Sequence, residues 1–236
     1  ANEELATSPL PISGGKDYMI ELSARLRGAV LSLVSMLCYH QERTYEELCE
    51  KYENNGPEHL AAKQIFGKLF DDYFGYRYLY LLRNIMIHDT MFAVSITGEA
   101  YANNGNPFGV INLDLDRSVF LDSEKIKAPL KAELASKPGD PSIIQMFMEI
   151  HREMRTANRK LLTILHPDLT SVCETVLEFD ALFDGRDGTR GLIHQASPEL
   201  RAPFTTGFTA WAGDIIMFAR SYTTEDWLSG NVDTDI

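Results

Sequence analysis

YLYLLRNIMIHD, residues Tyr78 to Asp89, is the stretch from which the fold and function of this chain are best approached. Its first half is almost wholly apolar, and its second half carries Arg83, Asn84 and His88. An α-helix turns about 100° per residue, so Asn84 and His88 stack one turn apart, with Arg83 on the flank of the same face. Polar groups on an apolar helix are rarely buried without partners. These three side chains are therefore the first candidate site, because they can converge on one phosphate-sized group.

Regular apolar spacing on both sides of this stretch predicts a mainly α fold. Apolar residues recur every three or four positions from Lys16 to about Tyr39, and a second acidic helical piece, 44–53, is expected after a break or bend. The next helix should begin at Pro57 and continue into the motif, with Gly75 as a candidate break. Later helices are expected at 123–134, 143–165 and 169–183.

The hydrophobic period changes directly after the motif. FAVSITG (92–98) and FGVINLDLDRSVFL (108–121) alternate and are rich in β-branched residues, with the turn-rich YANNGNP between them. These features predict a small β-hairpin at about 92–121, inserted among the helices.

Two further sets of polar residues are candidates for function. Three acceptors share one face of the second predicted strand: Asn112, Asp114 and Asp116. They fit a carboxylate-lined metal site or a solvated outer face, and we favour the outer face. Three cations share one face of the helix at 143–165: Arg152, Arg155 and Arg159. Such a face is most often simply solvated, but it would hold an RNA backbone if it lay near the motif.

An Arg followed directly by Asn and then, after three residues, by His resembles the signature of the HEPN superfamily. Its members are α-helical proteins, and many are metal-independent ribonucleases of toxin–antitoxin, phage-defence and RNA-processing systems. The resemblance covers Arg83, Asn84, His88 and a helical setting from about Pro57. It implies a HEPN-like helical bundle, an RNA substrate, and no metal or other cofactor. It also implies a homodimer in which two motifs face one cleft, with an antitoxin or regulatory protein as a further partner.

The same resemblance assigns roles to the three residues. His88 would move protons, since an imidazole titrates near neutral pH. Arg83 would stabilise the negative charge that develops on the phosphate, and Asn84 would orient His88 or bind a phosphate oxygen. The expected product ends are a cyclic phosphate and a 5′-hydroxyl, formed by attack of the RNA 2′-hydroxyl.

Two other interpretations of the motif remain open. The chain could be a non-catalytic HEPN-like protein that binds a nucleotide or a protein partner. Alternatively, Arg83 and His88 could be structural residues of a helical bundle, paired with neighbouring carboxylates. The candidate carboxylates are Asp71, Asp72 and Asp89.

Length and charge limit the possibilities further. A chain of 236 residues is consistent with one large domain, which we place at 16–222, after a flexible segment, 1–15, and before an acidic tail, 223–236. A net charge of −12 argues against non-specific binding to nucleic acid or to an anionic membrane. The longest apolar run, 29–39, is too short to span a bilayer.

The three cysteines have no disulfide framework spacing. Cys38 and Cys49 would lie about 16 Å apart on a continuous helix, which is too far for a disulfide. An odd number of cysteines without such spacing predicts reduced thiols and a cytoplasmic location. The chain also lacks the zinc-protease, di-iron, nucleophile-elbow and dinucleotide-binding motifs.

Overall fold

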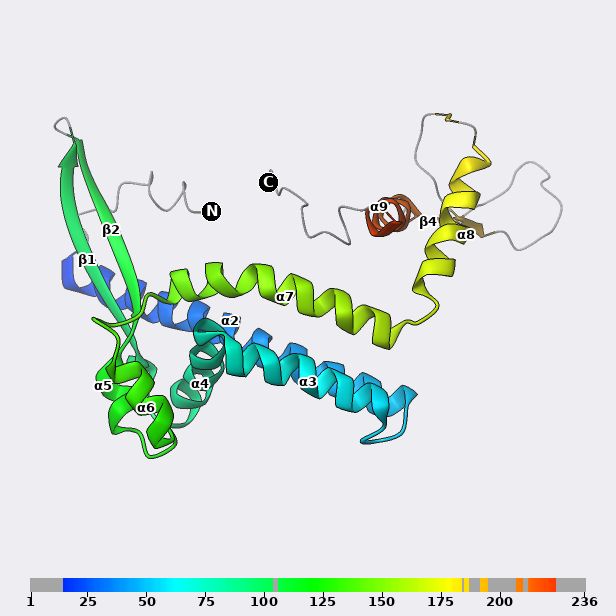
Figure 1. Ribbon diagram of the computed structural model, residues 1–236. Helices are drawn as coiled ribbons and strands as arrows, with labels where there is room; N and C mark the ends of the chain where they lie inside the picture. The colour runs from blue at the N-terminus through cyan, green and yellow to red at the C-terminus, as the bar shows by residue number, and fades with distance from the viewer. Residues whose placement is uncertain are drawn as a thin grey trace. The chain divides into compact units, whose positions relative to one another are not determined.

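The computed structural model describes residues 15–103, 106–183, 185–186, 192–194, 207–209 and 212–223. Helices dominate these residues and small antiparallel sheets accompany them, which confirms a mainly α fold with a β-hairpin (Figure 1). The contacts divide the chain into two compact units, 1–157 and 158–236, and each is described by itself. The prediction of one domain over 16–222 stays a prediction. The predicted flexible segment and acidic tail lie outside the described residues, apart from Gly15 and Thr223.

The first unit is built on α2 (Gly15–Lys51), which packs against α3 (Pro57–Asp72) and α4 (Phe74–His88). The predicted break after about Tyr39 is absent, because α2 is continuous over 37 residues and includes most of the expected second piece. Its buried positions recur on one helical face before and after residue 39, so the same face continues to meet the core. These buried positions are Val30, Val34, Leu37, Cys38, Thr44 and Leu48.

Among the described residues, the stretch Asp17–Lys51 of α2 is long and apolar enough, by length and composition alone, to cross a membrane. A core helix of a soluble protein meets the same criterion. Here α2 packs on α3 and α4, and Nε of Arg27 donates a hydrogen bond to the carbonyl oxygen of Val94 at 3.1 Å.

The corner between α3 and α4 places the motif helix. The α3 helix begins at Pro57 as predicted, and the chain is interrupted at Tyr73, two residues before the predicted break. Gly75 has a different role, because a Cβ atom there would lie 2.8 Å from the carbonyl oxygen of Met146 in α7 (Ile143–Leu165). The missing side chain lets α7 approach the first turn of α4 closely.

The predicted hairpin is formed by β1 (Val94–Asn103) and β2 (Asn106–Leu115). The prediction that its second strand runs to residue 121 is wrong. The strand ends at Leu115, and α5 (Arg117–Asp122) follows it. Asp116 caps this helix: its Oδ1 accepts hydrogen bonds from two backbone N–H groups of the first turn, at 3.0 and 3.3 Å. This cap outweighs the strand preference of the β-branched residues in the segment.

The remaining helices largely follow the predicted pattern. The helix expected at 123–134 begins later, as α6 (Ala128–Ala135), and α7 has the predicted bounds. The second unit contains the end of α7 and four further elements, with α8 packed on α9 and β3 paired with β4. Those elements are α8 (Leu169–Ala181), β3 (Leu192–His194), β4 (Gly207–Thr209) and α9 (Ala212–Thr223).

Candidate functional site

The apolar residues of α4 determine how its polar residues reach solvent. Leu82 and Ile85 are fully buried, so this part of the helix turns one face into the core. Arg83 and Asn84 lie between them in sequence and are half-buried, whereas His88 at the end of the helix is exposed. The three candidate residues therefore lie at the border between the core and the surface.

Arg83 and Asn84 are joined to each other. Nη1 of Arg83 donates a hydrogen bond to Oδ1 of Asn84, at 3.1 Å. Nε of Arg83 is buried without a hydrogen-bond partner, and none of the described carboxylates forms a salt bridge with its guanidinium. Burial raises the pKa of Cys38 to about 11 and also raises the pKa of Tyr80, while the Arg83 charge acts in the opposite direction on both groups. Arg83 thus carries a positive charge with no salt-bridge partner among the described residues, close to α2.

The structure joins Arg83 to Asn84 but shows no hydrogen bond from His88 to either of them among the described residues. Five residues along an α-helix correspond to a rotation of about 140° and a rise of about 7.5 Å, so Arg83 and His88 leave the helix in different directions. A single group that contacts both must span this separation, or a second copy must supply one of them.

Two of the three carboxylates proposed as internal partners of the motif, Asp89 and Asp72, have contacts with other residues. Asp89 forms a salt bridge with Lys125 and accepts a hydrogen bond from Oγ of Ser123, at 3.2 Å. The hydrogen bond from Lys125 is the main reason why the pKa of Asp89 lies below its usual value. Asp72 lies 4.0 Å from the ammonium group of Lys68. The charge of the neighbouring His88 also acts to lower the pKa of Asp89. Among the described residues Arg83 therefore has no carboxylate partner, whereas His88 lies near one.

The deeply buried arginine of α4 is Arg77, which the sequence did not single out. Nη2 and Nε of Arg77 donate to the two carboxylate oxygens of Glu133, at 2.6 and 3.1 Å. Nη1 donates to the carbonyl oxygens of Phe70 and Asp71, at the end of α3. The Tyr78 hydroxyl donates to Glu133 at 3.2 Å. The sequence offered one signal for this buried ion pair, an arginine within an apolar run. Its carboxylate partner lies 56 residues away.

The predicted basic residues lie on α7 at the expected helical spacing: Arg152, Arg155 and Arg159. The first is exposed and the other two are half-buried. α7 meets the N-terminal end of α4, where the Tyr73 hydroxyl donates to Glu153 at 2.8 Å and Gly75 faces Met146. Arg83 lies about 12 Å from Gly75 along the axis of α4. The recorded contacts therefore join α7 to the end of α4 opposite the motif, and RNA contact by these arginines stays a prediction.

The acidic residues of the hairpin do not form a metal site in the described structure. No group of three or more His, Cys, Asp or Glu side chains in the described ranges is arranged to hold a metal ion. Asp116 caps α5, outside the strand. Asp114 is half-buried, and its pKa is raised first by this burial and then by the nearby charge of Asp140.

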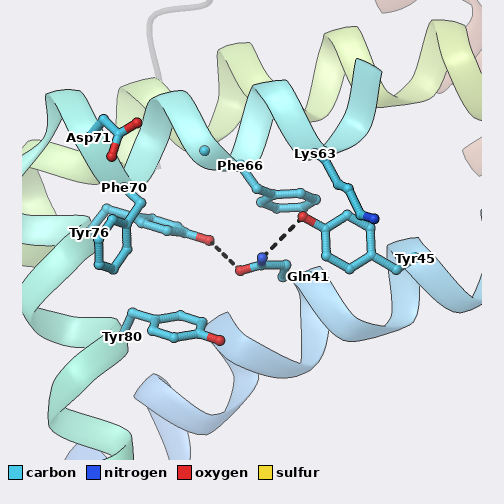
Figure 2. A pocket seen from close by; sticks show the side chains of 9 residues that line it. Gln41, Tyr45, Lys63, Phe66, Phe70, Asp71, Tyr76 and Tyr80 are labelled. Atoms are coloured by element: carbon cyan, nitrogen blue, oxygen red, sulfur yellow. Dashed lines mark hydrogen bonds between the residues drawn. The ribbon is translucent and has the colours of Figure 1, made fainter. Parts of the chain in front are cut away.

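A pocket that the sequence did not predict lies between α2, α3 and α4 (Figure 2). Its volume is about 280 Å³, and its lining residues come from all three helices. They are Gln41, Tyr45, Lys63, Phe66, Gly67, Phe70, Asp71, Tyr76 and Tyr80. The tyrosines of α4 do not all belong to the core. Tyr76 and Tyr78 are buried, but Tyr80 is half-buried and lines this pocket one turn before Arg83.

Comparison of the chain with protein-family models, with curated proteins and with solved structures gives no match in any of the three cases. The resemblance to the HEPN superfamily accordingly rests on Arg83, Asn84 and His88 and on their helical setting.

Proposed function

We propose that this chain is a metal-independent endoribonuclease of the HEPN type, which acts as a homodimer through Arg83, Asn84 and His88. One observation carries the proposal: the half-buried Arg83 is hydrogen-bonded to Asn84 and has no carboxylate partner among the described residues. The exposed His88 follows Asn84 by one helical turn. A guanidinium in this state is suited to bind a phosphate, because its planar set of donors matches the phosphate oxygens.

The proposed reaction uses only groups that RNA and the protein supply. The 2′-oxygen of a ribose attacks the adjacent phosphorus atom while one His88 accepts the 2′-hydroxyl proton. The bond from phosphorus to the 5′-oxygen breaks, and a protonated His88 gives its proton to that leaving oxygen. Arg83 stabilises the negative charge on the phosphate oxygens during the transfer, and Asn84 holds the guanidinium in position. The products are a 2′,3′-cyclic phosphate and a 5′-hydroxyl.

Two protomers are part of the proposal because one histidine serves only one of the two reacting oxygens at a time. The rotation of about 140° between Arg83 and His88 on one helix also makes it difficult for both to face one phosphate. A two-fold axis through the site would bring two motifs to one cleft and supply both histidines. The expected active species is therefore a homodimer.

The cellular setting of the proposal comes from the family resemblance alone. It comprises a cytoplasmic protein of a toxin–antitoxin or phage-defence system, which an antitoxin or another regulatory protein holds in check. The net charge of −12 means that RNA affinity would have to come from local cations such as Arg83, and not from the whole surface.

The test is cleavage of defined single-stranded RNAs in the presence of a chelator, followed by analysis of the new ends. Wild-type protein should produce cyclic phosphate and 5′-hydroxyl ends. His88→Ala and Arg83→Gln should each lower the rate by about 100-fold or more, as expected when a proton-transfer or charge-stabilising group is removed. A thermal melt of each variant would show whether the fold is retained.

His151→Ala is the matched control, because His151 is also an exposed histidine but lies on α7. Its cleavage rate should equal that of the wild type. Equal loss in the His88 and His151 variants, or no cleavage by wild-type protein, would contradict the ribonuclease proposal and favour a binding protein.

A further inference from the structure

The pocket between α2, α3 and α4 is small and is lined mainly by aromatic side chains. Its volume of about 280 Å³ lies slightly below the range of about 300 to 1,000 Å³ that is usual for drug-sized ligands. The walls are aromatic. Tyr45 and Phe66 meet edge to face, with ring centres 5.5 Å apart, and Phe70 and Tyr80 do the same at 6.1 Å. Phe66 is buried, whereas the half-buried rings of Tyr45, Phe70 and Tyr80 can contact an occupant.

A chain of hydrogen bonds crosses the pocket and leaves some of its polar groups available. The Tyr76 hydroxyl donates to Oε1 of Gln41, and Nε2 of Gln41 donates to the Tyr45 hydroxyl, both at 3.2 Å (Figure 2). This leaves a second N–H of Gln41 and the O–H of Tyr45 for a ligand. The Tyr80 hydroxyl has no hydrogen-bond partner among the described residues. Burial raises the pKa values of Tyr45 and Tyr80, so both hydroxyls keep their protons at neutral pH.

The charged residues of the pocket lie at its opposite ends. Figure 2 shows Lys63 beside Tyr45 at one end and Asp71 at the other. Lys63 is exposed, and its ammonium group donates to Oδ1 of Asn55 at 3.0 Å, which leaves further donors for an anion. An occupant with an anionic group at one end and an exocyclic amine at the other would match this polarity.

We propose that this pocket binds one nucleobase, stacked among the half-buried rings of Tyr45, Phe70 and Tyr80, with its phosphate directed toward Lys63. The base edge would be recognised by the free groups of Gln41 and of the tyrosine hydroxyls. A purely apolar ring would leave these polar groups unpaired, which disfavours it. The nucleotide is a free mononucleotide or one unit of a single-stranded RNA, because the two share this chemistry. The inference does not depend on RNA cleavage, since it is tested by binding alone.

The experiment is isothermal titration of the full chain with adenosine 5′-monophosphate, adenosine and ribose 5-phosphate. The adenine base is chosen for its exocyclic amine. The monophosphate should bind most tightly, adenosine more weakly, and ribose 5-phosphate not measurably. A short single-stranded RNA distinguishes a site for a free nucleotide from a site for an RNA strand. It is titrated into the His88→Ala protein, so that the RNA is not cleaved. Binding at least tenfold tighter than that of the mononucleotide assigns the site to a strand, and equal binding assigns it to a free nucleotide.

Two pairs of variants test the position of the ligand. A Cβ atom at Gly67 or at Gly28 would meet no atom within 4 Å, so a side chain starts in open space at either position. Gly67 lines the pocket, whereas Gly28 lies elsewhere, on α2. Gly67→Leu should abolish binding of both adenosine and its monophosphate, while Gly28→Leu should leave the binding unchanged.

The second pair separates the base from the phosphate. Lys63→Ala should weaken binding of the monophosphate by about fivefold, the effect of losing one solvent-exposed charge pair, and leave adenosine unaffected. Lys68→Ala removes an exposed lysine of the same helix that does not line the pocket, and it should change neither affinity. No binding of the monophosphate, or binding that survives Gly67→Leu in a folded protein, would overturn the proposal. If the wild-type protein binds the nucleotide but does not cleave RNA, the ribonuclease proposal is contradicted and the nucleotide-binding proposal is not.

Discussion

Arg77 and Glu133 form a two-point ion pair that ties α4 to α6, with nitrogen-to-oxygen distances of 2.6 and 3.1 Å. The arginine side chain is 11% exposed and the glutamate side chain is 34% exposed. Arg77 also donates to two carbonyl oxygens at the end of α3, so one guanidinium connects three helices. This contact fixes the start of the helix that carries the motif.

Replacing Arg77 by Met should therefore destabilise the fold by about 2–3 kcal/mol, because Glu133 and the α3 carbonyl groups lose their donors. The estimate lies toward the lower end of the range for buried pairs, since Glu133 is partly screened by solvent. Urea denaturation followed by circular dichroism measures the change. Arg25→Met removes an exposed pair with Glu21 and serves as the control, with an expected change within about 0.5 kcal/mol. Equal losses in the two variants would show that the pair at Arg77 adds nothing beyond a surface contact.

Two glycines in neighbouring helices should respond to alanine in opposite directions. Gly67→Ala should stabilise the fold by about 0.5–1 kcal/mol, because the methyl group enters open space and the unfolded chain loses freedom. Gly75→Ala should destabilise it by about 1–3 kcal/mol, because the new Cβ would lie 2.8 Å from a backbone oxygen of Met146. The measurement is the midpoint of urea unfolding for both variants. A shift in the same direction for both would contradict the close approach of α7 to α4.

The three cysteines should differ in reactivity, since Cys49 is exposed and Cys38 and Cys173 are buried. Thiolates are the reactive form, and burial raises the pKa of Cys38 from 9.0 to about 11 and also raises that of Cys173. At pH 8 iodoacetamide should therefore modify Cys49 first and the other two only in urea. Because the folded pKa of Cys38 is raised, its contribution to stability is complete below pH 9 and is lost as the pH rises toward 11.

Mass spectrometry of peptides after timed alkylation identifies the modified thiols. Modification of Cys38 as fast as Cys49 in the folded protein would contradict the buried position of Cys38 between α2 and its neighbours. Cys49→Ser is the useful control, because its folded form should take up almost no reagent.

The homodimer proposal makes a quantitative prediction for mixed subunits. If cleavage requires His88 from both protomers, equal amounts of wild-type and His88→Ala protein should retain about one quarter of the wild-type rate after subunits exchange. If each protomer works alone, about one half should remain. The measurement is the cleavage rate of a labelled RNA at constant total protein. A rate of one half, or a protein that stays monomeric during sedimentation at the assay concentration, would contradict the shared site.

The sequence by itself determined the features that depend on neighbouring residues. Apolar periodicity gave the bounds of α7, proline gave the start of α3, and alternation around a turn located the hairpin. The order Arg83, Asn84, His88 likewise came from sequence alone, and with it the proposal of a ribonuclease.

Only the tertiary structure decided the features that depend on residues far apart in the chain. The predicted break in α2 is absent because its buried face continues to meet the core, and Asp116 caps a helix where composition had extended a strand. The pairing of Arg77 with Glu133 and the pocket shared by three helices were also not predictable. Arg77 and Glu133 are 56 residues apart, and the Gln41 and Tyr76 side chains that meet in the pocket are 35 residues apart. Local sequence fixes the backbone pattern, but which side chains meet across that pattern is decided by packing.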